Sequence, residues 1–461
     1  MDVAPSSARI LGLRGLHMER DLTVGSEWRA ILFFSLPIMG STFLQVMYQL
    51  ADSLIVGNYI GPTALGAVGL TNSPTWLLLT FCTGIGTGTS IVVAQYYGAG
   101  RRRDIRVVTA AAYALSVAVC ALLLIPSLWL AKPLMWGVLA APPEMREMSV
   151  LYFRVYAAGI LFQMLYNVTY GILRAHGDSR SGLLFLLVAA SLNVLLDLLF
   201  VVVYRWGVGG AAAATVLSQA GCALASMLYL ARVLPHLRPR LSFGMRARAK
   251  MRMIAGISAP IIAQSAIFAV GFTAMQRLVN SFGPPSIEGY AAMQRVELLA
   301  HIPSQSFNAA ISAFAGQNVG AGKPERARAG YRAAMRMGAA VTVALGIAVI
   351  AASRPLLEMF NISGESLLRG REHLILLMIF MILSMTSNIT SGFLQGVGDV
   401  RVTALASLAS LSVRLIASYA LARTFIDFRS IYVSMPPAWA CGCLVVVLRY
   451  RSGKWRRAAL R

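Results

Sequence analysis

The sequence has few charged residues, few acids and no organised set of cysteines. Charged residues make up 13% of its 461 residues and hydrophobic residues 57%. A soluble domain has roughly 25% charged residues, so this composition excludes an ordinary soluble enzyme. The five cysteines all fall inside apolar stretches without a regular spacing, which excludes a disulfide scaffold.

Signatures of the common catalytic sites are also missing. The sequence contains no H-E-x-x-H, no glycine-rich Walker loop, no G-x-S-x-G and no C-x-x-C pair. We therefore predict that the chain is not an enzyme, that it has no cofactor and that it binds no metal.

Long apolar stretches are what the sequence has in abundance. The mean hydropathy is +0.67, and twelve stretches come close to the ~20 residues that a helix needs to cross a bilayer. They span residues 31–56, 67–95, 107–131, 149–172, 183–204, 210–231, 253–279, 290–316, 333–353, 373–397, 402–422 and 430–448. The sequence thus predicts an all-α, polytopic membrane protein with twelve transmembrane helices.

Basic residues outnumber acidic ones by 41 to 18, and their positions indicate the orientation. With twelve spans both termini lie on one side, and most lysines and arginines fall in the segments of that side, including Arg101, Arg102 and the tail from Arg449. Cytoplasmic segments are enriched in such residues. We predict a protein of the cell (inner) membrane with cytoplasmic termini, whose positive charge contacts anionic lipids rather than nucleic acid.

The second half of the chain repeats the first with a nearly constant offset. Three segments match: Pro37 with Pro260, Gln95–Gly100 with Gln317–Gly322, and Gly171–Arg180 with Gly392–Arg401. Six helices per half is an even number, so the halves enter the membrane in the same direction and form two pseudo-symmetric lobes. The Gln-x-x-Gly-Ala-Gly segments are typical of helix C-termini.

This repeat predicts the domain organisation. We expect a cytoplasmic segment 1–29, an N-terminal lobe 30–232, a basic linker 233–252, a C-terminal lobe 253–448 and a basic tail 449–461. A transport pathway between two lobes of one chain would let the protein act as a monomer.

Three acids, Asp52, Asp197 and Glu297, lie well inside the predicted spans. Ionisable groups at bilayer depth are candidates for function, because an isolated charge there is unfavourable. Asn193 lies one helical turn before Asp197, and Thr215 on the next helix offers a hydroxyl, so these residues could form a polar pocket that binds H⁺ or Na⁺. For Glu297, two residues after Arg295, we expect a local hydrogen-bond network.

The proline at position 37 adds a mechanical element. It removes one backbone hydrogen bond from the helix that carries Asp52, 15 residues further on. We expect this helix to bend at Pro37.

Taken together, these segments resemble the multidrug and toxic-compound extrusion (MATE) transporters. The resemblance covers about residues 30–450 and rests on Leu50-Ala51-Asp52, the two Gln-x-x-Gly-Ala-Gly ends, Gly171–Arg180, Asn193-x-x-x-Asp197 and Gly207–Ala211 leading to Thr215. It implies export of amphipathic organic cations by alternating access, in exchange for H⁺ or Na⁺ bound at Asp52, Asn193, Asp197 and Thr215. The NorM-like branch of this family carries acids in the seventh and tenth helices, and the corresponding spans 253–279 and 373–397 contain none. The chain therefore resembles the DinF-like and archaeal branch more closely. On this basis we prefer H⁺ as the coupling ion.

Two further expectations concern the substrate. Polar, aromatic and thioether side chains on the inner helices are candidates for the substrate cavity: Gln45, Met47, Tyr48, Gln163, Asn167, Gln276, Met293 and Gln294. An alternative function is a flippase or exporter of an anionic lipid-linked saccharide or other anion, with Arg154, Arg295 and Arg414 lining the cavity. A second alternative is a non-transporting membrane receptor or scaffold.

Overall fold

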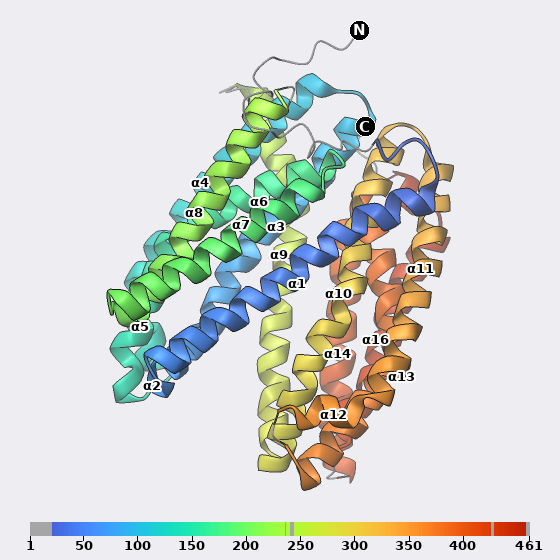
Figure 1. Cartoon of the computed structure of the whole chain (residues 1–461). Coiled ribbons are helices and arrows are strands. Elements are labelled where there is room, and N and C mark those ends of the chain that lie inside the picture. Colours follow the sequence, from blue (N-terminus) through green and yellow to red (C-terminus); the bar gives the residue numbers. More distant parts are fainter. Residues whose placement is uncertain (1–20, 236, 240–243, 361, 426–427, 458–461) are drawn as a thin grey trace. The chain divides into compact units, whose positions relative to one another are not determined.

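The structure, a computed structural model, describes residues 21–235, 237–239, 244–360, 362–425 and 428–457. Within these ranges the chain consists of helices and the turns between them (Figure 1), which confirms the predicted all-α fold. The predicted segment 1–29 up to residue 20, parts of the linker 233–252 and the end of the tail 449–461 lie outside the described residues.

The described part of the first half of the chain forms eight α-helices. They are α1 (Glu27–Tyr59), α2 (Pro62–Leu70), α3 (Asn72–Gly98), α4 (Arg102–Pro133), α5 (Arg146–Ala158), α6 (Ile160–Ala175), α7 (Arg180–Asp197) and α8 (Gly207–Val233). Two of these helices continue directly as π-helices, α4 into η3 (Leu134–Val138) and α7 into η5 (Leu198–Val203), and a 3-10 turn, η4 (Pro143–Met145), precedes α5.

The second half is built in a similar way. Its helices are α9 (Met245–Asn280), α10 (Pro284–Gly320), α11 (Pro324–Ala351), α12 (Ser353–Glu358), α13 (Gly364–Gly396), α14 (Val400–Phe425), α15 (Ser430–Val433) and α16 (Met435–Arg451), followed by the 3-10 turn η6 (Lys454–Arg457).

All twelve predicted spans correspond to helices. Among the described residues ten helices are long and apolar enough to cross a membrane, and an eleventh span results when α5 and α6, bent by 46°, are counted together. The predicted span 290–316 is α10, which has 37 residues and is not among these ten helices. The bend between α5 and α6 lies at Gly159, where a Cβ atom would stand 2.4 Å from Val216 of α8.

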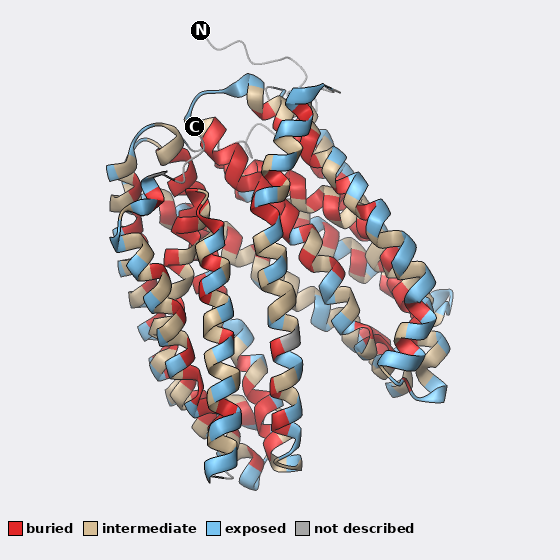
Figure 2. Ribbon diagram, turned by 180° about the vertical axis from the view of Figure 1, so that it is seen from behind, coloured by how far each residue is buried: buried red, intermediate tan, exposed pale blue. Residues whose placement is uncertain are grey.

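Exposed apolar side chains cover the outer faces of these helices. Figure 2 shows buried residues running along one side of many helices while exposed residues occupy other sides. On α4, Leu122 is 71% exposed and Trp129 81%. Such a surface is suited to hydrocarbon rather than water.

The chain forms two compact units whose boundaries fall inside helices. Unit 1 contains residues 40–262 and unit 2 contains residues 22–39 together with 263–461. The expected lobes 30–232 and 253–448 differ from these units at two places, because the beginnings of α1 and of α9 each belong to the unit formed by the other half of the chain. Covalent connections between the units therefore run through α1 and α9, and the linker 233–252 belongs to unit 1.

The Gln-x-x-Gly-Ala-Gly segment of unit 2 explains why the start of α1 belongs to that unit. Its Gln317 and Asn318 are fully buried. The Gln317 side-chain oxygen accepts a hydrogen bond of 3.1 Å from the backbone of Leu22, and the Asn318 amide donates one of 3.1 Å to the Leu22 carbonyl. Arg326 adds a salt bridge of 3.0 Å to Glu27. These bonds anchor the start of α1 to the end of α10.

The matching segment of unit 1 anchors the start of α9. The Tyr96 hydroxyl accepts a hydrogen bond from Lys250, and the same ammonium group lies 3.5 Å from a carboxylate oxygen of Asp104. Both segments also end their helices as predicted, because Gly100 and Gly322 take the positive φ angles of 68° and 72° that favour glycine at a helix C-terminus.

Glycines let equivalent helix pairs approach closely in both units. In unit 1, a Cβ at Gly171 of α6 would lie 2.3 Å from the Gly86 carbonyl oxygen of α3. In unit 2, a Cβ at Gly392 of α13 would lie 2.4 Å from the Asn308 carbonyl oxygen of α10. Close backbone packing of this kind holds membrane helices together, since lipid surrounds apolar side chains as well as protein does.

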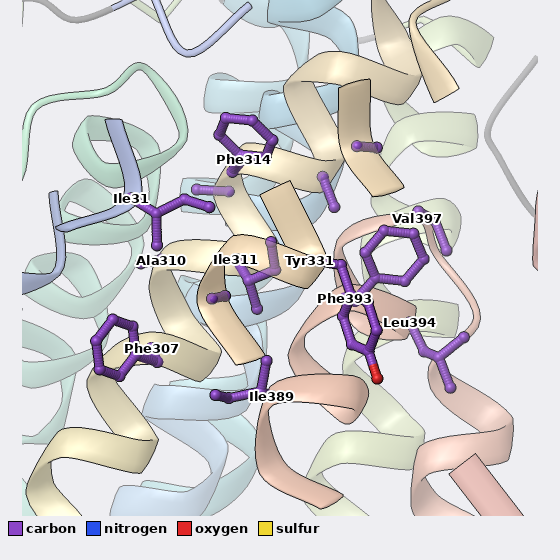
Figure 3. Packing of buried hydrophobic residues seen from close by; sticks show 14 of the residues in the cluster. Ile31, Phe307, Ala310, Ile311, Phe314, Tyr331, Ile389, Phe393, Leu394 and Val397 are labelled. Carbon is purple, nitrogen blue, oxygen red and sulfur yellow. The ribbon is translucent and has the colours of Figure 1, made fainter. Parts of the chain in front are cut away.

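A large apolar cluster surrounds the anchored end of unit 2. Figure 3 shows Ile31 of α1 beside Phe314 and Ala310 of α10, with Tyr331 of α11 and Phe393 of α13 packed together nearby. Phe314 and Phe393 are fully buried. Packing and hydrogen bonds together therefore fix the first part of α1 on unit 2.

Candidate ion-coupling site

Two acids from different helices meet in unit 1. Asp52 lies in the last third of α1, and Asp197 is the last α-helical residue of α7. Each carboxyl group lies within electrostatic range of the other. Ionised carboxylates only accept hydrogen bonds, so a bond between these two forms when one of them holds a proton.

The site is deeply buried and its acceptor atoms have no donor. Asp197 is 0% exposed and Asn193 is 2% exposed, whereas Asp52 is half-buried. One oxygen of Asp52, both carboxyl oxygens of Asp197 and both amide atoms of Asn193 are buried without a hydrogen-bond partner among the described residues. Buried polar atoms are normally satisfied, so the unpaired oxygens are suited to a small cation, whereas the Asn193 amide nitrogen can only donate.

The backbone changes its helical form directly at this site. Asn193 and Asp197 lie one turn apart, which brings the amide and the carboxyl to one face of α7. The π-helix η5 begins with the next residue, Leu198, and ends shortly before Arg205, which has a φ of 55°. Single π-helical turns inside α-helices are frequent at functional sites. No sequence motif had indicated this change.

An apolar cluster begins three residues after Asp52 on α1. Ile55 and Val56 follow Asp52 on α1 and are buried together with Val201 of η5 and Ala211 of α8. Of the two acids, Asp52 is the more accessible, since its side chain is half-buried and Asp197 is buried.

Two tyrosines lie within electrostatic range of the acids. Tyr48 is one turn before Asp52 on α1, and Tyr152 of α5 is influenced by both Asp52 and Asp197. Tyr48 was predicted as a cavity residue, whereas Tyr152 was missed. A tyrosine in an apolar span carries no signal of its own, and only the packing of α5 within unit 1 reveals its position.

Thr215 lies on α8, which packs against α7. Its hydroxyl donates a hydrogen bond of 3.2 Å to the Ala211 carbonyl of its own helix. The lone pairs of this oxygen stay available, so Thr215 can act toward a bound cation only as an acceptor.

The predicted cavity residues are divided between the units. Gln45, Met47, Tyr48, Gln163 and Asn167 are half-buried residues of unit 1, and Gln276, Met293 and Gln294 belong to unit 2. Met293 is fully buried in an apolar cluster. Asn167 and Gln276 donate hydrogen bonds of 2.8 Å to the Gln163 carbonyl and to the Asn280 side chain.

Glu297 of α10 has a local partner. Its carboxylate lies 3.5 Å from the imidazole of His301, one turn further on. The neighbouring Arg295 is exposed and lies over the ring of Phe360 at 5.3 Å, so it is not the partner of Glu297. Within the described ranges no group of three His, Cys, Asp or Glu side chains is arranged to hold a metal.

Comparisons with known proteins identify the family. A sequence model of the MatE family matches residues 37–199 and 260–420, one segment in each half. The probable multidrug resistance protein YpnP of Bacillus subtilis is 28% identical over 95% of this chain and 98% of its own length. YoeA of the same organism, also named a probable multidrug resistance protein, is 25% identical over 94% of this chain and 95% of its own.

The fold is that of solved MATE structures. One of them, titled as the outward-facing conformation of a multidrug resistance MATE family transporter, superposes with a TM-score of 0.89 at 22% sequence identity and covers 96% of this chain and 99% of that protein. These relatives are transporters and not enzymes. Together with the apolar helices, the two-segment match shows that the chain belongs to the MatE family of multi-pass membrane transporters.

Proposed function

We propose that this protein exports amphipathic organic cations in exchange for protons bound at Asp52 and Asp197. The observation that carries the proposal is the pair of neighbouring carboxyl groups in unit 1, of which three buried oxygens have no hydrogen-bond partner among the described residues. The names of the relatives, multidrug resistance proteins, support a broad range of small-molecule substrates.

The geometry favours a proton over Na⁺. Each ionised carboxylate at bilayer depth is unfavourable by on the order of 3 kcal/mol. A single proton between Asp52 and Asp197 removes one charge and supplies the missing donor for the other carboxyl group. Na⁺ is the alternative ion, for which Asn193 and Thr215 would provide further oxygen ligands.

Proton exchange also suggests how conformation is controlled. Asp52 is half-buried and Asp197 is sealed, so we expect protons to reach Asp197 by way of Asp52. The charge of the pair would favour one conformation over the other, because differential binding is what shifts such an equilibrium. Pro37 lies two residues before α1 passes from unit 2 to unit 1, and we propose that α1 bends there.

The remaining assignments follow from the sequence. The predicted spans 253–279 and 373–397 contain no acid, which supports the DinF-like branch. We propose a location in the cell membrane with both termini in the cytoplasm, contacts with anionic lipids, and function as a monomer.

The test is ion-driven dye uptake into everted membrane vesicles. We expect an imposed pH gradient, and not a Na⁺ gradient, to drive uptake of ethidium. Asp52→Asn and Asp197→Asn should each reduce this uptake at least tenfold, since an amide cannot release a proton at this depth. Glu147→Gln is the matched control, because Glu147 is a 72% exposed acid of the same unit.

Three outcomes would contradict the proposal. Full uptake in both aspartate variants would remove Asp52 and Asp197 from the mechanism, and uptake driven only by Na⁺ would change the ion. An absence of energised uptake would favour the receptor or scaffold.

The anionic flippase remains the alternative substrate class. Its three candidate arginines have different surroundings: Arg154 of unit 1 donates to the Leu128 carbonyl, Arg295 is exposed, and Arg414 is half-buried in unit 2. Translocation of a lipid-linked saccharide in a flippase-deficient strain would favour this alternative.

A further inference from the structure

One face of α10 carries a stripe of polar residues inside unit 2. Tyr290, Gln294, Glu297 and His301 follow one another at spacings of four, three and four. Residues with this spacing lie above one another on one face of an α-helix. The stripe begins six residues after the start of α10 at Pro284, so it extends from about 9 Å into the helix at ~1.5 Å per residue.

Two neighbouring helices complete a cluster around this stripe. His373 of α13 stacks against Tyr290 with ring centres 5.6 Å apart. Arg414 of α14 lies within electrostatic range of both Glu297 and Tyr290. The titratable and charged groups of this cluster are therefore Tyr290, Glu297 and His301 from α10, His373 from α13, Arg414 from α14 and Tyr432 from α15, whose ring centre lies 5.2 Å from that of His373.

Three polar nitrogens of this cluster are buried without a partner. They are Nε2 of Gln294, Nδ1 of His373 and Nε of Arg414. His373 is 0% exposed, and its other nitrogen lies 3.2 Å from the sulfur of Met435. The amide and guanidinium nitrogens can only donate, so a ligand that satisfies them must bring acceptor oxygens.

The charges of the cluster allow such a ligand. Glu297 is already paired with His301 at 3.5 Å, and no salt bridge joins Arg414 to an acid in the described part of the chain. A guanidinium group recognises carboxylates and phosphates through paired hydrogen bonds.

We propose that Arg414, Gln294 and His373 form a binding site for an anionic group, a carboxylate or a phosphate, in unit 2. The group can belong to a transported solute or to a free anion. Binding to the purified protein does not depend on the proposed proton coupling, whereas the role in transport rests on the proposed function.

The first experiment measures binding to the full-length protein in detergent. Sodium phosphate and sodium acetate are titrated in a constant background of sodium chloride, and the thermal unfolding midpoint Tm is recorded. We expect both anions to raise Tm in a saturable manner and Arg414→Gln to weaken the apparent affinity at least tenfold. Arg354→Gln, which removes a 72% exposed arginine from the same unit, should behave like the parent protein.

A second variant guards against misfolding of Arg414→Gln. Gln294→Met keeps the length of the side chain and removes the donor, so we expect a smaller loss of affinity, about threefold to tenfold, which is the effect of one hydrogen bond. No saturable shift in the parent protein, or equal shifts in all variants, would overturn the proposal, because internal water would then satisfy the donors.

The second experiment separates the two sources of the anion. Vesicle uptake of carboxyfluorescein, an anionic dye, is compared with uptake of ethidium. If the site binds the anionic group of a solute, Arg414→Gln should reduce uptake of the anionic dye at least tenfold and leave ethidium uptake within twofold. Unchanged uptake of both dyes would restrict the site to free anions and overturn its role toward solutes. Asp52→Asn should stop uptake of both dyes while phosphate still raises Tm, so failure of the two proposals can be told apart.

Discussion

The polar clusters of the two units occupy related positions and have opposite chemistry. With the offset of 221 that relates Arg180 to Arg401, Asn193 corresponds to Arg414 and Asp197 corresponds to Ser418. In unit 1 the buried atoms without partners are mostly acceptor oxygens, whereas in unit 2 they are mostly donor nitrogens. The duplicated backbone would thus present the proposed cation site in one half and the proposed anion site in the other.

This difference teaches which parts of the repeat are constrained. The close contacts of Gly171 and Gly392 and the two Gln-x-x-Gly-Ala-Gly ends serve the same structural purpose in both halves. The side chains of the two polar clusters do not serve a common structural purpose in the two halves. Ser418, for example, forms a hydrogen bond of 2.6 Å with Ser434 and carries no charge.

The largest effect is expected when the chemistry of unit 2 is introduced into unit 1. Asn193→Arg places a guanidinium group one turn from Asp197, where it should pair with the carboxylates and keep them ionised. We expect ethidium uptake driven by a pH gradient to fall to background, at least a hundredfold. Asn193→Gln retains the amide and should keep at least a tenth of the activity. Proton-driven uptake in the arginine variant would show that the acids need not lose their charge.

The second comparison concerns the glycine contacts. Gly392→Val would force a side chain against the Asn308 carbonyl, and Gly171→Val would do the same at the Gly86 carbonyl. Overpacking of this kind destabilises by about 1–3 kcal/mol or more, so we expect a loss of folded protein by size-exclusion chromatography in both. Gly256→Ala, at a position with open space, is the control. Normal yields of both valine variants would mean that the helices can separate without loss.

The contacts that hold the start of α1 on unit 2 should contribute more to stability than those that hold the start of α9 on unit 1. Gln317→Ala and Asn318→Ala each leave a buried group unpaired and should destabilise unit 2 by about 1–3 kcal/mol, seen as a lower Tm. Tyr96→Phe removes only the hydroxyl that accepts from the half-buried Lys250 and should lower Tm less. An equal or larger effect of Tyr96→Phe would contradict the greater burial of the unit 2 anchor.

The smallest effect is expected at an exposed ion pair. Arg354 lies 2.7 Å from Glu358 on α12, and this contact raises the pKa of the guanidinium above its usual value. Arginine is protonated at any ordinary pH, so a raised pKa adds no pH dependence in that range. Exposed pairs contribute little, and Arg354→Gln should leave Tm within about 1 °C of the parent. A clear fall would indicate that α12 has an additional contact.

The fold followed from the sequence because its signals were repeated along the chain. Twelve apolar stretches and the offset between Pro37 and Pro260 predicted the helices and the duplication, and the helices are confirmed. Asp52 and Asp197 could be named in advance because an acid in an apolar span is conspicuous, and the spacing of Asn193 and Asp197 defined their common face.

What the sequence could not give were features set by contacts between distant segments. Leu22 bonds to Gln317 and Asn318 across almost 300 positions, and no local pattern contains that contact. The π-helix after Asp197 and the position of Tyr152 likewise depend on packing. The sequence indicates the stripe on α10 only in part, because it predicts Gln294 as a cavity residue and does not show that His373 of a distant helix packs beside Tyr290.

The exchanged beginnings of α1 and α9 bear on how such a chain could arise. A single six-helix protein folding alone would have its first helical segment undocked and an empty place where that segment binds. Two identical copies would fill both places by swapping these segments, as domain-swapped dimers do. Fusion of two copies into one gene would then make the swap permanent, so that neither half can form a complete unit without the other.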